Sequence, residues 1–493
     1  MASHRPSNSR GRYTAPNLAN HGGARPLHSL GYTVSHKLRT TIALALVALF
    51  AFVATATGAT ASNLFALIND SKTAVLGQSH VKSNQVIDPN AGKTVNILVL
   101  GQDTREGEAN AAIGAGGSAS DHQSDTAMIV QISADRSYIN IVSIPRDSIV
   151  DVPSCNTTNG TVPERHNAQF NSIFALGYTT GGDVASAASC TLNAVNSLTG
   201  LDISQFVVAD FAGLSSMIDA VGGVDICVNQ DMKDDTTGID LTQGMHHLDG
   251  VAATQYARVR HVGDGTDIMR TTRQQYLVKS LLREASSKNL FTQTNQLYQL
   301  ATAGIQSLKM SDGLADVGVL VGLAAALKNL DTSKIYAQTV PVTEWARDRN
   351  RVVWTKDADD LWKKLAESKP LTVADDSDSK DSSSNSKDSK DSSESSSASP
   401  SETASATPSE SSDSQQAAGS TNSSDASASA SADSTPDPVT GLITKADGTL
   451  VDPNTGGIVD PKTGTIRDPN TSQAIGIADA YVNSTFCAVT EKE

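Results

Sequence analysis

Carboxylates at the ends of apolar runs, followed later by a group of arginines, are the residues of this chain best suited to chemistry. Within residues 95–147, one apolar run ends in Asp103, another begins at Asp125, and a third ends just before Arg146. Arginines then gather in residues 258–273. Carboxylates hold hard divalent cations, and guanidinium groups bind phosphate oxygens in bidentate fashion. The pattern predicts a metal–phosphate site, with Mg²⁺ or Mn²⁺ held by Asp103 and Asp125.

The spacing of the later residues supports one shared pocket. Arg258 and Arg260 are two apart and face the same side of an extended segment. Arg270 and Gln274 are four apart and share one face of a helix. Arg273 is not expected to point into the same pocket. The plainer alternatives are turn or cap aspartates and solvated arginines with surface ion pairs, and each residue taken alone fits them.

Alternating strand and helix patterns must position these side chains. The continuous apolar run 95–100 predicts a strand buried on both faces, and runs 126–133 and 138–144 predict a strand pair joined by a polar turn. Over residues 94–370 the alternation predicts one α/β (α+β) catalytic domain, a central mixed β-sheet flanked by helices. Helices are expected at 167–178, 183–198, 211–221, 251–258, 267–285, 290–308 and 313–327.

The first sixty residues predict a membrane anchor. Residues 1–40 are basic and contain no acid, and residues 41–61 form a largely apolar run long enough for one transmembrane helix. Positive charge before the span favours a cytoplasmic amino terminus. We therefore expect a single-pass protein of the cell membrane with an extracytoplasmic catalytic domain after a connector at 62–93. The alternative is a cleaved signal peptide, because Ala54 to Ala56 has the form of a cleavage site.

Composition separates the carboxy-terminal part from the domain. Residues 371–435 are rich in Ser, Asp and Ala, which predicts a disordered linker. In residues 436–493, Asp452, Asp460 and Asp468 each begin an Asp-Pro step, which favours a chain of turns over calcium loops. The formal net charge of -15 argues against nucleic-acid partners.

The four cysteines match no zinc or redox motif. An even count behind an export segment suggests two disulfides. The pairing expected is Cys155 with Cys190 and Cys227 with Cys487, and four buried thiols are the alternative.

Successive motifs resemble those of the LytR-CpsA-Psr family, in order and spacing, over residues 95–284. They are NILVLGQDTR, SDTAMIVQIS, VSIPRD, FNSIFALGY, FAGLSSMIDAVGGVDICV and YARVRHVGDGTDIMRTTRQQ. The resemblance implies a membrane-anchored phosphotransferase. Such enzymes move a glycopolymer from a polyprenyl-pyrophosphate carrier onto peptidoglycan in cell-wall biogenesis.

The resemblance also implies residue roles. Asp103 and Asp125 would be the metal ligands, and Asp267 would help to position the arginines. The polyprenyl chain would enter the apolar interior between sheet and helices, and Asp103 or Asp125 would accept the proton of the attacking hydroxyl. The residues expected to bind the pyrophosphate are Arg146, Arg258, Arg260, Arg270 and Gln274, and among them Arg146 and Arg260 are also counted as catalytic with the two metal ligands.

One position departs from the family pattern. Gln123 stands where the family has Arg before its Ser-Asp pair, and Arg105 or Arg165 are the residues that would compensate. Two other functions use the same residues. One is a lipid-pyrophosphate hydrolase with water as the acceptor, and the other is a non-catalytic regulator that binds the precursor.

Overall fold

The computed structural model describes residues 72–81, 92–114, 122–263, 265–287, 300, 302–305, 307–372 and 435–488. The expected basic tail at 1–40, the expected span at 41–61 and nearly all of the expected linker at 371–435 lie outside them. Among the described residues, no helix is long and apolar enough to cross a bilayer. The division of the chain into domains stays a prediction.

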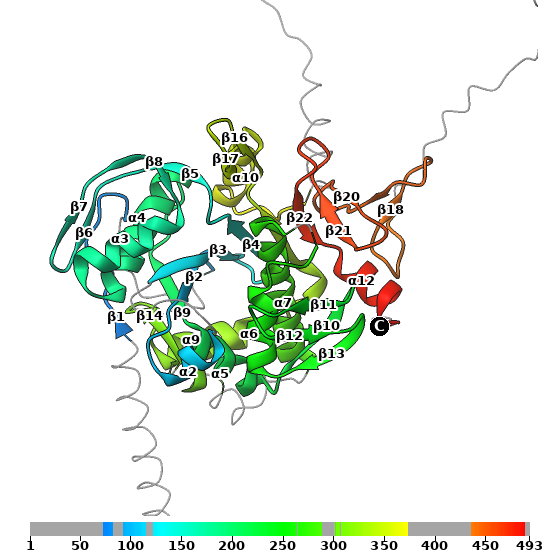
Figure 1. Ribbon diagram of the computed structural model, residues 1–493, viewed down its shortest axis with the longest axis horizontal. Helices are drawn as coiled ribbons and strands as arrows, with labels where there is room; N and C mark the ends of the chain where they lie inside the picture. The colour runs from blue at the N-terminus through cyan, green and yellow to red at the C-terminus, as the bar shows by residue number, and fades with distance from the viewer. Residues whose placement is uncertain are drawn as a thin grey trace, which may run out of the picture. The chain divides into compact units, whose positions relative to one another are not determined.

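A seven-stranded mixed sheet forms the centre of the described body (Figure 1), as the sequence predicts. β2 pairs antiparallel with β3 and parallel with β9, while β4 pairs antiparallel with β3 and parallel with β15. In sheet order the strands are β1 (Lys72–Thr73), β14 (Leu308–Ser311), β9 (Gln205–Ala209), β2 (Val95–Asp103), β3 (Gln123–Ile132), β4 (Ile139–Ile144) and β15 (Ile335–Thr339).

Helices flank this sheet. They are α2 (Glu108–Ile113), α3 (Asn171–Gly181), α4 (Val184–Thr199), α5 (Phe211–Val221), α6 (Gly250–Arg258), α7 (Asp267–Ser287), α9 (Val317–Ala326), α10 (Asp357–Ala366) and α12 (Asp479–Phe486), with a 3₁₀ turn at Thr332–Lys334. The helices expected at 211–221, 251–258 and 267–285 match α5, α6 and α7 closely. α5 ends at Gly222, whose φ of 92° is a left-handed conformation that glycine adopts readily.

Within the described residues, five small two-stranded sheets lie outside the central sheet. They are β5 (Ile149–Val152) with β8 (Arg165–Gln169), β6 (Cys155–Thr157) with β7 (Gly160–Val162), β10 (Val224–Val228) with β13 (Gly244–Leu248), β11 (Met232–Asp234) with β12 (Ile239–Leu241), and β16 (Val342–Trp345) with β17 (Asp348–Trp354). Polar composition hides most of these short strands from a periodicity reading. The sequence predicts a helix at 290–308, but Leu308 is the first residue of strand β14, so the prediction is wrong at this residue.

Period-2 alternation builds the main core. Leu98 and Leu100 of β2, Ile129 of β3 and Val142 of β4 are fully buried and belong to one cluster with Phe174 of α3. Burying a side chain of this size stabilises the fold by about 1.5–3 kcal/mol. Helices α5, α6 and α7 lie on the opposite side of the sheet. The predicted site residues lie between the sheet and these helices.

A β-bulge interrupts the ladder where chemistry was predicted. Gly101 pairs with Thr126 and Gln102 pairs with Ser124, so Asp125 is an extra residue without a partner on β2. A Cβ on Gly101 would lie 2.9 Å from the Cβ of Thr126, so the close pairing at this point depends on glycine. A bulge re-aims the side chain that it releases from the ladder. Asp125 is thus turned out of the regular alternation of its strand.

The carboxy-terminal segment, residues 435–488, forms a five-stranded antiparallel sheet and α12. Its strands are β18 (Ile443–Thr444), β19 (Leu450–Val451), β20 (Ile458–Val459), β21 (Thr465–Arg467) and β22 (Ala474–Ile477). The Asp-Pro steps are turns, because the carboxylates of Asp460 and Asp468 accept hydrogen bonds from backbone N–H groups two residues ahead.

Covalent and ionic ties hold this segment to the body. The two disulfides are Cys155–Cys190 and Cys227–Cys487, the pairs expected from the sequence, and the second spans 260 residues. Asp479 of α12 accepts from Lys279 of α7 at 2.5 Å. α7 therefore packs against the central sheet and also binds the carboxy-terminal segment.

We predict that removing the long-range disulfide frees the carboxy-terminal segment. A Cys227→Ser/Cys487→Ser double variant is expected to lose about 2–5 kcal/mol of unfolding free energy, because the crosslink no longer restricts the unfolded chain. Hydrogen exchange should rise in β22 and α12. A Cys155→Ser/Cys190→Ser variant is the matched control and should leave exchange in residues 435–488 unchanged. Unaltered exchange of β22 in the first variant would contradict the prediction.

Candidate active site

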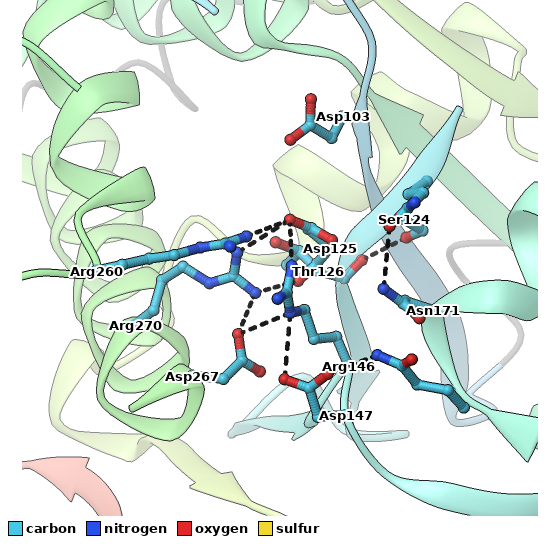
Figure 2. A network of polar contacts seen from close by, with 12 residues as sticks. Asp103, Ser124, Asp125, Thr126, Arg146, Asp147, Asn171, Arg260, Asp267 and Arg270 are labelled. Carbon is cyan, nitrogen blue, oxygen red and sulfur yellow. Dashed lines mark hydrogen bonds and ion pairs between the residues drawn. The ribbon is translucent and has the colours of Figure 1, made fainter. Parts of the chain in front are cut away.

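Three guanidinium groups converge on one carboxylate oxygen. Oδ2 of Asp125 accepts from Arg146 at 2.9 Å, from Arg260 at 2.5 Å and from Arg270 at 3.2 Å (Figure 2). Arg146 follows β4, Arg260 lies in the loop after α6, and Arg270 is in the first turn of α7. The bulge on β3 thus directs Asp125 to the point where three separate segments bring their arginines together.

A second carboxylate supports the same arginines from the other side. Asp267, the first residue of α7, accepts from Arg270 and lies 3.4 Å from Nε of Arg146. Asp147 adds a contact of 3.3 Å to Nε of Arg146 and also accepts from Arg351 of β17 at 2.8 Å. Charged side chains this close and this poorly hydrated hold one another in a fixed geometry.

The pKa shifts show which charges the site favours. Burial alone raises the pKa of Asp125, but Arg270, Arg146 and Arg260 outweigh burial and leave that pKa below its ordinary value. Burial raises the pKa of Asp267 above its ordinary value, although Arg270 and Arg146 oppose the rise. Asp125 is therefore stabilised as an anion, whereas the anionic form of Asp267 is disfavoured.

Two of the arginines, Arg260 and Arg258, are destabilised as cations by their surroundings. Burial lowers the pKa of Arg260, and its neighbours Arg270 and Arg146 lower it further. Burial likewise lowers the pKa of Arg258, with a further contribution from Arg105. Cations destabilised by burial and by other cations gain from an added anion. The electrostatics of the site thus favour binding of a multiply charged anion such as pyrophosphate.

Arg258 and Arg105 lie together on the ring of Phe211, at the start of α5. Their guanidinium carbons are 4.3 Å and 4.9 Å from the ring centroid. Arg105 also pairs with Asp103, and Arg258 donates to the carbonyl of Ile113 at 2.8 Å. Stacking of this kind adds a cation–π attraction and limits guanidinium rotation.

Arg105 and Arg258 line one end of an apolar cavity of about 420 Å³ between the sheet and the helices. We call it the first cavity. Val99, Met128, Leu214, Leu277 and Leu281 supply apolar walls. The polar end contains Asp103, Arg105, Asp125, Arg258, Arg260, Arg270 and Gln274. The cavity combines an apolar body with a charged end, which suits an amphiphile whose headgroup is anionic.

The residues present fit a divalent cation in part. Asp103 and Asp125 line the same cavity, and Oδ1 of Asp125 is buried and has no hydrogen-bond partner. In the described ranges, no group of three or more His, Cys, Asp or Glu side chains is arranged so that it could hold a metal ion. A cation held by two carboxylates would need phosphate oxygens and water for its remaining positions, as Mg²⁺ commonly does.

Two neighbours of Arg270 on α7 have different tasks. Gln274 faces the first cavity and donates to the carbonyl of Ala257 at 3.1 Å. Arg273 is buried and donates to the carbonyl of Val259 at 2.8 Å and to that of Val262. Arg273 therefore holds the loop that carries Arg260 and does not enter the first cavity, as its spacing from Gln274 indicates.

Gln123 is not part of the arginine cluster. Its side-chain oxygen accepts from Asn171 of α3 at 3.2 Å, and Gln123 does not line the first cavity. Of the proposed substitutes, Arg105 lies in the cavity, whereas Arg165 is exposed on β8. Sequence reasoning missed Phe211 and Arg351, since an aromatic helix start and a distant arginine carry no local signal of this site.

Comparisons with known proteins point to one family. A model of the LytR_cpsA_psr family matches residues 59–367, more than half of the chain. The cell wall biosynthesis protein LcpA of Corynebacterium glutamicum is 27% identical over 267 residues, which are 51% of this chain and 51% of LcpA. The polyisoprenyl-teichoic acid–peptidoglycan teichoic acid transferase TagU of Oceanobacillus iheyensis is 26% identical over 279 residues, 55% of this chain and 78% of TagU.

Solved structures with similarity include TagV of B. subtilis, at 21% identity and a TM-score of 0.42, covering 56% of this chain and 96% of TagV. The chain spans about half the length of LcpA and of the probable cell wall biosynthesis protein LcpB from the same organism.

We predict unequal losses of stability on neutralising the two site carboxylates. Asp125→Asn should lower the free energy of unfolding at pH 7 by about 3–5 kcal/mol, because the buried guanidinium of Arg270 and the partly exposed ones of Arg146 and Arg260 lose their shared anion. Asp267→Asn should lower it by less, because burial raises the pKa of Asp267 and makes its anionic form less favourable in the folded state. Urea unfolding of both variants and the wild type measures the difference.

The pH dependence follows from the direction of each shift. The contribution of Asp125 is present above the unfolded pKa of about 3.9 and is lost as the pH falls through its lower folded pKa. The gap between wild type and Asp125→Asn should therefore shrink in acid. Equal losses in both variants at pH 7 would contradict this assignment.

Proposed function

The chain belongs to the LytR-CpsA-Psr family, and on that basis we propose that it transfers a glycopolymer from a polyprenyl-pyrophosphate carrier to peptidoglycan. The observation that carries the proposal is the first cavity, whose apolar walls end in clustered arginines. A lipid chain fits the walls, and its pyrophosphate fits the charged end. The similarity to TagU, a teichoic acid transferase, and to LcpA, a cell wall biosynthesis protein, supports this proposal.

The proposed reaction is an in-line displacement at phosphorus. A hydroxyl of the acceptor attacks the phosphorus that bears the glycopolymer, and a new phosphodiester P–O bond forms. The bridging P–O bond breaks, and polyprenyl phosphate leaves with the electron pair. The proton of the hydroxyl passes to a site carboxylate. Charge spreads over the phosphoryl oxygens, so positioning and electrostatics supply most of the catalysis.

The arginines perform most of that work. In the folded protein, Arg146, Arg260 and Arg270 all donate to Asp125. Pyrophosphate presents several oxygens to the same guanidinium groups. On binding, each arginine could therefore donate to a phosphate oxygen of its own and would no longer share Oδ2 of Asp125. Because the donors are already converged, little reorganisation is required as charge develops. Gln274 and Arg258 bind the outer phosphate oxygens from the wall of the first cavity.

Asp103 and Oδ1 of Asp125 would hold Mg²⁺ or Mn²⁺ beside the pyrophosphate. When bound, the cation neutralises phosphate charge and polarises the phosphoryl group. The protein is further proposed to be a single-pass membrane protein with an extracytoplasmic catalytic domain. Two disulfides agree with an oxidising compartment.

A defined transfer assay tests the proposal. Full-length protein in detergent receives a synthetic polyprenyl-pyrophosphate glycan, peptidoglycan fragments and Mg²⁺, and mass spectrometry identifies the products. The wild type is expected to form acceptor linked to glycan phosphate. Arg260→Ala should reduce kcat/KM by about 100-fold to 1000-fold, because a donor to the developing charge is lost. Lys328→Ala, an exposed cation outside the cavities, is the matched control.

Metal dependence is tested in the same assay. EDTA should abolish transfer, and added Mg²⁺ or Mn²⁺ should restore it. Asp103→Asn should require a higher Mg²⁺ concentration for half-maximal activity, because one ligand loses its charge. If free glycan phosphate were the only product, the protein would be a hydrolase and the transferase proposal would be wrong. Tight binding without any product would identify a precursor-binding regulator.

A further inference from the structure

A second groove of about 670 Å³ meets the arginine cluster from another side. Arg260 and Asp267 form its inner end. The β16–β17 hairpin supplies one wall through Arg351, and the β21–β22 turn supplies another through Arg467 and Gln473. The carboxy-terminal segment is thus part of a cavity that reaches the proposed reaction centre.

The second groove differs in character from the first cavity. Both are lined by Arg260 and His261, but the walls of the second groove mix charged and polar side chains with Pro145, Ile268 and Val352, whereas leucines and Val99 dominate the walls of the first cavity. Asp103 lines only the first cavity, and Asp267 lines only the second groove. In Figure 2 these two aspartates lie on opposite sides of Asp125. The arginine cluster therefore separates an apolar compartment from a more polar one.

An in-line displacement needs the attacking and leaving oxygens on opposite sides of phosphorus. The leaving polyprenyl phosphate belongs to the apolar compartment, which leaves the polar compartment for the attacking group. We propose that the second groove binds the acceptor glycan strand and that the carboxy-terminal segment forms its outer wall. This inference rests on the transferase function and names the site of its second substrate.

The inner end of the second groove is equipped to receive a hydroxyl. Oδ2 of Asp267 is buried and has no hydrogen-bond partner, while Oδ1 faces Arg146 and Arg270. A sugar hydroxyl entering the groove can donate to Oδ2. The donor satisfies a buried acceptor that the folded protein leaves without a bond, which favours binding at this point.

The walls suit the other groups of a peptidoglycan strand. Arg349, Arg351 and Arg467 line the groove, and guanidinium forks bind the carboxylates of stem peptides in bidentate fashion. Nη1 of Arg467 donates to the carbonyl of Ser472 at 3.1 Å, which holds the side chain along the β21–β22 turn. Gln473 adds amide donors and acceptors for sugar hydroxyls and peptide groups.

α7 fixes this wall relative to the reaction centre. Its first turn carries Arg270, and further along it Lys279 and Arg283 bind Asp479 at 2.5 Å and 3.5 Å. Tyr276, also on α7, donates to Asn483 of α12 at 2.9 Å. One helix therefore sets both the phosphate-binding arginine and the wall that would guide the acceptor.

Binding and kinetics of two wall variants test the inference. Arg467→Ala and Gln473→Ala are compared in the full-length protein with Lys462→Ala, an exposed cation of the same segment that does not line the groove. Calorimetry measures binding of uncrosslinked peptidoglycan strands without donor, and the transfer assay measures KM for each substrate. Arg467→Ala should weaken strand binding and raise the acceptor KM by about tenfold. Donor KM should stay the same.

The outcomes separate this inference from the proposed function. Normal transfer with unchanged acceptor KM in both wall variants would refute the groove and leave the transferase intact. A raised donor KM would refute it too, and would assign the groove to the glycopolymer of the donor. Strand binding that depends on Arg467 without any product would support the groove while the transferase fails. If hydrogen exchange shows that Arg467→Ala disturbs β22, Gln473→Ala carries the test.

Discussion

The shared carboxylate of Asp125 is the interaction on which the site depends. Three arginines, one after β4 and two from the neighbouring α6–α7 loop and α7, donate to one of its oxygens, and each would repel the others without it. The bulge on β3 places Asp125 at their meeting point. The folded protein thus keeps an anion of its own where a substrate anion is proposed to bind. That arrangement concentrates positive charge without separating the segments that carry it.

α7 links this cluster to the rest of the molecule. It begins with Asp267 and Arg270 at the cluster, donates from Gln275 to Ser143 of the central sheet at 2.9 Å, and reaches Asp479 of the carboxy-terminal segment through Lys279. Buried ion pairs are costly to break on one side alone. Displacement of α7 would disturb the arginine cluster, the sheet contact and the carboxy-terminal segment together, so these three regions are mechanically dependent on one another.

The sequence predicted much of this arrangement because the relevant signals are local. Apolar runs predict β2, β3 and β4, and helical spacing predicts α5 and α7. The positions of Asp103 and Arg270 at the ends of these elements follow from the same patterns. The β-bulge at Asp125 could not be predicted, because one extra residue in a β-ladder does not change the hydrophobic pattern of the sequence enough to be recognised. Arg351 and Phe211 were missed for another reason: their contacts join segments far apart in the chain. The groove wall formed by Arg467 is a tertiary feature of the same kind.

The Cys227–Cys487 disulfide can form only late in the synthesis of the chain. Cys155 and Cys190 are separated by 35 residues, so both are present soon after one another during synthesis, whereas Cys227 precedes its partner by 260 residues. Until Cys487 has been made, Cys227 lacks the partner of its disulfide. An unfinished chain can therefore be distinguished chemically from a finished one, because only the latter has no reactive sulfhydryl at position 227. Thiol-specific labelling of nascent chains would then report maturation.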